Sequence, residues 1–80
     1  MSLAAAIRHL RAGEWEKAHP IVQDDDSAFG CWGHGIVHMY EGDLGNARYW
    51  YRRAGRPFPT QVAPAAEVEL LAAAYEGQAE

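Results

Sequence analysis

One cysteine and two histidines share a face of a predicted helix in the middle of this 80-residue chain. Cys31, His34 and His38 are three and four residues apart, a spacing that stacks side chains one turn above another. Imidazole nitrogens and a thiolate are ligands that zinc and other divalent transition metals accept. His9 and His19 are further candidates, because both lie in segments expected to pack beside this helix. This spacing suits a metal or ligand site.

The same histidines also have a structural interpretation, which we favour. Histidine pairs one turn apart are common, and no glutamate follows His34 and His38 in the arrangement of metalloproteases. His9 and His38 occupy matching places in two similar segments, which suits packing. Each ring would then bond to a backbone carbonyl or to a carboxylate.

Two further features bear on catalysis. Near a helix N-terminus the Cys31 thiol could have a lowered pKa and react, although a buried, inert thiol is the more usual state. Ser2, Ser27 and Thr60 all stand where helix caps or turns are expected, which leaves little for a hydrolytic triad. No glycine-rich phosphate loop follows a strand. We therefore predict that the protein is not an enzyme.

An arginine-rich segment is the best candidate for binding a partner. We call its five residues the arginine surface: Arg48, Tyr49, Arg52, Arg53 and Arg56. Guanidinium groups and an aromatic ring can bind acidic or aromatic groups of a protein or peptide partner. The alternative is a solvated helix face whose cations favour the helix C-terminus, and the general weakness of surface charges supports it.

The acidic run at residues 24–26 has two interpretations as well. With Ser27, these aspartates can cap the following helix and stay solvated. A calcium loop would need more oxygen ligands at defined spacing, and they do not follow here. We favour capping.

Composition narrows the class of protein. The formal net charge is −4, which disfavours nucleic acid as a partner because that binding depends on Lys and Arg neutralising phosphates. A single cysteine cannot form a disulfide within the chain. The first ten residues are too short for a secretory signal, and no apolar stretch approaches the roughly 20 residues that span a bilayer. We expect a soluble cytoplasmic protein that does not bind membranes.

Apolar periodicity, caps and glycines predict an all-α chain. Pro20 conflicts with the second helix, which must either bend there or break into two pieces. Gly30, Gly33 and Gly35 weaken the third helix by roughly 1 kcal/mol each, so we expect a neighbouring helix or a bulky ring to approach closely. Beyond Gly77 we expect a frayed tail. The predicted helices cover residues 3–12, 14–22, 28–40, 44–54 and 64–75.

An internal repeat organises these helices. Gly13 and Gly42 each stand five residues before an alanine, Ala18 and Ala47, in segments 29 residues apart. A repeat of this length predicts stacked helical units, each of which must bury its apolar face on a neighbour. The repeat therefore predicts one domain over residues 1–80, with hairpins at 2–23 and 28–55 and a closing helix at 64–76. Because such a short stack has two open ends, we also expect that it can form a homo-oligomer.

The second unit resembles a tetratricopeptide repeat over roughly residues 31–64. That motif places small residues where helices cross, an aromatic on the second helix and a proline near the end. The matching residues are Gly35, Gly42, Ala47, Tyr51, Ala54 and Pro59. Residues 41–55 are also similar to small helical proteins to which no activity attaches.

The resemblance implies a protein-interaction scaffold built from two hairpins and half of a third. Where that family expects bulky apolar side chains, this chain has Cys31, His34 and His38. Our first hypothesis is a non-enzymatic module that binds a protein or peptide and can self-associate. The alternative is a small metal- or ligand-binding protein that uses the face of His34 and His38.

Overall fold

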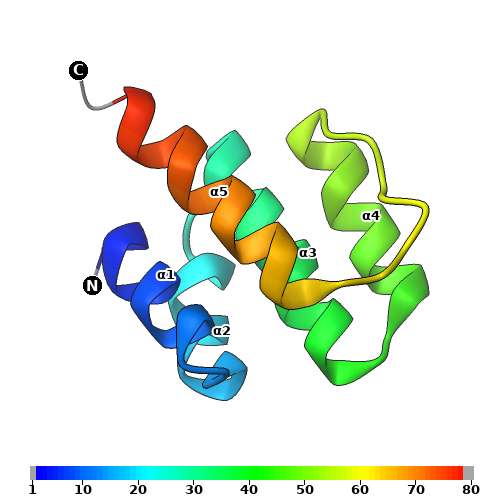
Figure 1. Ribbon diagram of the computed structural model, residues 1–80, viewed down its shortest axis with the longest axis horizontal. Coiled ribbons are helices and arrows are strands. Elements are labelled where there is room, and N and C mark those ends of the chain that lie inside the picture. Colours follow the sequence, from blue (N-terminus) through cyan, green and yellow to red (C-terminus); the bar gives the residue numbers. More distant parts are fainter. Residues whose placement is uncertain (1, 79–80) are drawn as a thin grey trace.

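The computed structural model describes residues 2–78, and within that range five helices and no strand form a stack of antiparallel hairpins (Figure 1). The predicted all-α class is therefore confirmed. The fourth helix has the predicted bounds, whereas the fifth continues past the predicted end at residue 76 to Gln78. The frayed tail predicted beyond Gly77 is helical at Gln78, and its remaining part lies outside the described residues. The helices are α1 (Leu3–Arg11), α2 (Trp15–Gln23), α3 (Ala28–Glu41), α4 (Leu44–Ala54) and α5 (Pro64–Gln78).

The sequence repeat corresponds to a repeated helix ending. Gly13 and Gly42 adopt left-handed conformations, with φ of 74° and 86°, which glycine reaches without a steric penalty. After each glycine, the next backbone N–H donates to the carbonyl of a histidine, His9 at 2.8 Å or His38 at 2.9 Å. This pattern closes a helix with a Schellman-type turn. The two histidines therefore occupy equivalent places in their hairpins.

Helix α2 runs without interruption through Pro20, so of the two predicted alternatives, a bend or a break into two pieces, the break does not occur. The proline ring is exposed, while Ala18, Ile21 and Val22 on the same helix are buried. Burial of that apolar face holds the helix together although the proline removes one backbone hydrogen bond.

The acidic loop supports the start of α3. The Gly30 backbone N–H donates to Ser27 Oγ at 3.0 Å, and the Ser27 N–H donates to Asp25 Oδ1 at 2.9 Å. These bonds agree with the capping interpretation of the loop.

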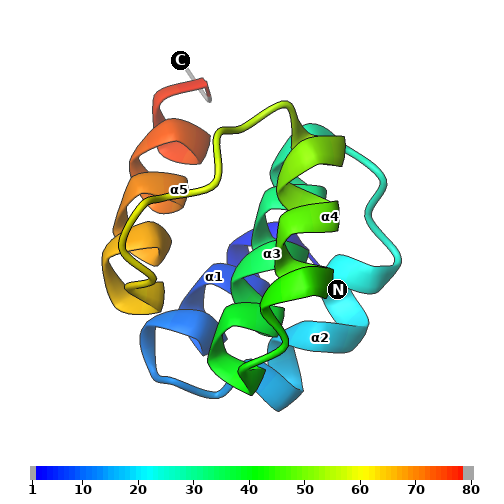
Figure 2. The same ribbon diagram turned by 90° about the vertical axis from the view of Figure 1, so that its right-hand side faces the viewer.

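The central element of the stack is α3. It packs against every other helix, and all of its residues from Gly30 to Met39 are buried. Figure 2 shows α3 between α4 on one side and α5 on the other. A Cβ added at Gly35 would lie 2.5 Å from the Tyr51 ring, and one at Gly33 would lie 3.1 Å from Val22. The predicted close approach at these glycines is thus confirmed.

One carboxylate ties three helices together. Glu67 on α5 accepts hydrogen bonds through Oε1 from the Tyr51 hydroxyl at 2.5 Å and from Trp32 Nε1 at 3.2 Å. Burial, reinforced by the Glu67 carboxylate, raises the pKa of Tyr51 far above its usual range. Tyr51 therefore stays a neutral donor.

Among the described residues, no helix combines the length and the apolar character that crossing a membrane requires.

Candidate functional site

All five residues of the arginine surface are exposed on α4 and the turn that follows it. Each guanidinium lies over an aromatic ring. The distances from the guanidinium carbon to the ring centre are 4.8 Å for Arg48 over Phe58, 5.9 Å for Arg52 over Tyr49, 5.0 Å for Arg53 over Trp50, and 3.8 Å for Arg56 over Trp32.

None of these four arginines forms an ion pair with another described residue. Within residues 2–78, the ion pairs of the protein involve His9, Arg11, Lys17 and His38, and none reaches α4 or the following turn. The one side-chain bond on the surface joins Arg53 Nη1 to the Tyr49 hydroxyl at 3.4 Å. The remaining guanidinium N–H groups face solvent and can bind an anionic partner.

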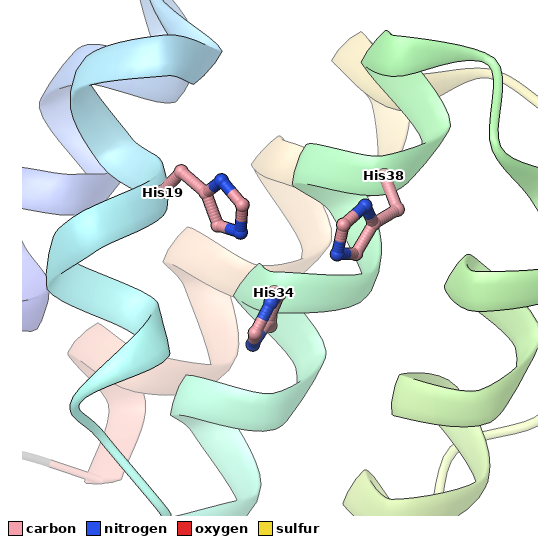
Figure 3. Close-up of side chains that lie close together, drawn as sticks. All are labelled: His19, His34 and His38. Carbon is pink, nitrogen blue, oxygen red and sulfur yellow. The ribbon is translucent and has the colours of Figure 1, made fainter.

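Three imidazoles converge between α2 and α3. His19 projects from α2 toward His34 and His38 on α3 (Figure 3). One nitrogen from each ring lies within 4.8 Å of the other two, and the ring centres are 5.0–5.2 Å apart. We call these three residues the histidine cluster. It unites the predicted pair His34 and His38 with His19, which the sequence offered only as a further candidate.

Packing holds the His34 ring in place. Its side chain stacks on Trp50 with ring centres 3.9 Å apart and planes 14° apart, and the residue is only 5% exposed. Burial lowers the pKa of His34 to about 4, helped by His38, His19 and the positive charge of Arg53. The ring is therefore neutral at pH 7 and has a free nitrogen lone pair.

Glu41 orients the His38 ring. His38 Nδ1 lies 2.9 Å from Glu41 Oε1, and because a carboxylate only accepts, Nδ1 carries the proton. In the neutral ring, Nε2 then carries the lone pair. In the first hairpin, His9 Nδ1 makes the matching contact with Glu14 at 2.9 Å. Each ring was expected to bond to a backbone carbonyl or to a carboxylate, and in both hairpins the partner is a carboxylate.

Cys31 stands apart from the histidine cluster. It is 2% exposed, and its Sγ lies 3.9 Å from the Asp26 carbonyl oxygen, to which it donates. Burial raises the pKa of the Cys31 thiol, so it stays protonated near neutral pH, as the inert-thiol interpretation expects. His9 likewise lies outside the group of close nitrogens.

Two acidic groups lie at the edge of the cluster. Glu41 and Asp43 each have a carboxylate oxygen within 4.8 Å of one another and of a His38 nitrogen. Both are exposed, and Asp43 also caps α4 by accepting from the Asn46 N–H at 3.3 Å. Their structural roles account for their positions.

Comparisons with known proteins give no relative from which a function could be carried over: no protein-family model, no curated protein and no solved structure matches this chain.

Proposed function

We propose that this protein is a non-enzymatic interaction module that binds an acidic peptide segment of a partner protein through the arginine surface. The observation that carries the proposal is the set of four exposed arginines, each lying over an aromatic ring and none paired with a carboxylate among the described residues. We place this binding in the cytoplasm, where a lone reduced cysteine is the norm.

Charge segregation supports this function. Four of the seven lysines and arginines fall within residues 48–56, although the whole chain carries a formal charge of −4. A positive patch attracts anionic segments even when it stands on a protein whose net charge is negative. It therefore favours association with an acidic segment of a partner.

Stacking prepares the surface for a carboxylate. Contact with a ring face restricts the motion of a guanidinium, while its in-plane N–H groups remain available. Carboxylates accept two parallel N–H bonds from such a group. Because the side chains are already ordered, binding loses less conformational entropy than it would with free arginines.

The hairpin order supports a tetratricopeptide-like architecture for the module. Gly35 lets α3 and α4 approach where that family places small residues, against Tyr51 and Ala47. Self-association is a further part of this proposal, and Leu70 on the outer face of α5, 53% exposed, supports it. Light scattering on the wild type and on Leu70→Glu tests it, because a monomer at high concentration in both would eliminate self-association.

Fluorescence polarisation with a labelled Glu- and Asp-rich peptide tests the binding function. We expect binding that weakens with added salt, since exposed charges are screened. The double substitution Arg48→Glu/Arg52→Glu should lower the affinity by at least about tenfold, because each reversed charge repels the peptide.

The matched control is Arg8→Glu/Lys17→Glu, which changes the net charge equally on exposed sites of α1 and α2. It should leave most of the affinity intact. Equal losses in the two double variants would show a net-charge effect and overturn the proposal. Stronger binding of a single-stranded oligonucleotide than of the acidic peptide would do so as well.

A further inference from the structure

The histidine cluster has the composition and the geometry of a metal site. Its three nitrogens come from two helices and lie within 4.8 Å of one another. In a tetrahedral zinc site, Zn–N bonds of about 2.0–2.1 Å place ligand nitrogens roughly 3.3 Å apart. Small rotations of the rings, of about 1 Å at the nitrogens, would bring the three together on one ion.

The cluster also has the supporting contacts that metal ligands require. A ligating histidine usually gives its other N–H to a carboxylate, which fixes the ring and the tautomer. Glu41 makes that contact with His38 Nδ1. The Trp50 ring holds the plane of His34 by stacking on it. Two of the three rings are thus oriented before any ion arrives.

His34 is the residue that packing alone explains least. The residue is only 5% exposed, yet its ring makes no hydrogen bond to another described residue. Among the described residues, every buried side-chain nitrogen or oxygen either has a hydrogen-bond partner or keeps some solvent exposure. The His34 nitrogens are therefore not fully closed to solvent.

We infer that His19, His34 and His38 together bind one divalent transition-metal ion, of which zinc is the representative. Three imidazoles suit zinc, nickel and copper, and they leave one coordination position for water. Cys31 is not a ligand, and Glu41 is a positioning residue that acts through His38. The bound ion links α2 to α3.

This inference does not depend on the arginine surface. The ligands lie on α2 and α3, whereas the arginines lie on α4 and the turn after it. Zinc affinity should therefore be the same in Arg48→Glu/Arg52→Glu as in the wild type.

Isothermal titration of the tag-free protein with zinc chloride at pH 7 tests the inference. We expect one ion per chain and a raised melting temperature, since the ion binds the folded state. His19→Gln, His34→Gln and His38→Gln should each lower the affinity by at least about tenfold, and Glu41→Gln by about 10–100-fold.

His9→Gln is the matched control, because His9 has the same place in its hairpin and the same kind of carboxylate partner. It should leave the affinity unchanged. Far-UV circular dichroism checks that each variant folds. If His34→Gln unfolds, the variants of the half-buried His19 and of the exposed Glu41 still test the inference. Absent binding, several weak sites, or an equal loss in His9→Gln and His38→Gln would overturn the inference.

Discussion

The histidine cluster and the arginine surface adjoin each other but are built in opposite ways. The cluster is largely buried and draws its side chains from two hairpins, whereas the surface is exposed and comes from one helix and its C-terminal turn. Trp50 contacts both, since its ring stacks on His34 and lies under Arg53. Ring packing orders both regions, but only the cluster depends on how helices of different hairpins meet.

Because one region is buried and the other exposed, the two regions respond differently to pH and to substitution. The buried His34 imidazole gains a charge only as the pH falls to about 4, whereas an arginine stays charged at any pH near or below neutral. Exposed charges contribute little to stability, while changes in a packed interior are costly. We therefore expect substitutions and pH changes at buried groups to alter stability more than charge reversals on the arginine surface.

The first prediction concerns pH and His34. Its folded-state pKa of about 4 lies below the ordinary value of 6.5, so protonation favours the unfolded chain. The stabilisation is complete above pH 6.5 and is lost as the pH falls toward 4, by about 3 kcal/mol in total. Urea unfolding of the metal-free protein at pH 7, 5 and 4 measures this loss.

The control for this experiment is His34→Gln, whose stability should fall much less over the same range. Arg48→Ala/Arg52→Ala should keep the wild-type pH dependence. Parallel curves for the wild type and His34→Gln would show that other groups cause the loss.

The second prediction concerns Glu67, which lies beneath the arginine surface rather than the cluster. Glu67→Ala removes the acceptor of Tyr51 and Trp32 and should cost about 2 kcal/mol of unfolding free energy. Glu69→Ala, which removes an exposed pair with Arg11, should lower the unfolding free energy much less, because water screens that pair. Urea unfolding compares the two, and equal costs would remove the special role of Glu67.

The third prediction concerns the contact between α3 and α4, beside His34 and Trp50. In Gly35→Ala the new methyl group would collide with the Tyr51 ring. Alanine also favours the helix more than glycine does, so the net loss of unfolding free energy should be about 1–2 kcal/mol. Gly45→Ala meets no atom within 4 Å and should stabilise by about 0.5–1 kcal/mol. Thermal unfolding measures both, and a stabilised Gly35→Ala would refute the close approach.

The fourth and smallest effect concerns the arginine surface itself. Arg48→Glu/Arg52→Glu should change the unfolding free energy by less than about 0.5 kcal/mol, because both side chains are exposed and pair only with ring faces. Urea unfolding at pH 7 measures this change. A loss above about 1 kcal/mol would identify the surface as structural rather than reserved for a partner.

The fold was predictable where local chemistry decides it. Ser2 and Ser27 accept the N-cap hydrogen bonds of α1 and α3, and Gly13, Gly42 and Gly55 end helices with positive φ. These are signals within a few residues of each helix end. At Pro20 the sequence left both a bend and a break open, and α2 stays unbroken because its buried face outweighs one missing backbone bond.

The arrangement of the candidate site residues was predictable to different extents for the same reason. Spacing along one helix identified the arginine surface and the pair His34 and His38. It also suggested Cys31, but at about 1.5 Å of rise per residue that cysteine lies about 10 Å along the helix from His38, too far for one ion. His19 joins the pair through hairpin packing, which no spacing in the sequence displays.

The imidazole signals of the four histidines provide the most direct test of the central claim, that the histidine cluster is a metal site. A long-range ¹H–¹⁵N spectrum of the tag-free protein should be recorded before and after one equivalent of zinc. We predict that His19, His34 and His38 each shift one ring nitrogen to the position of a metal-bound imidazole, while His9 stays unchanged. Equal shifts of all four rings, or no shift in the cluster, would contradict the account.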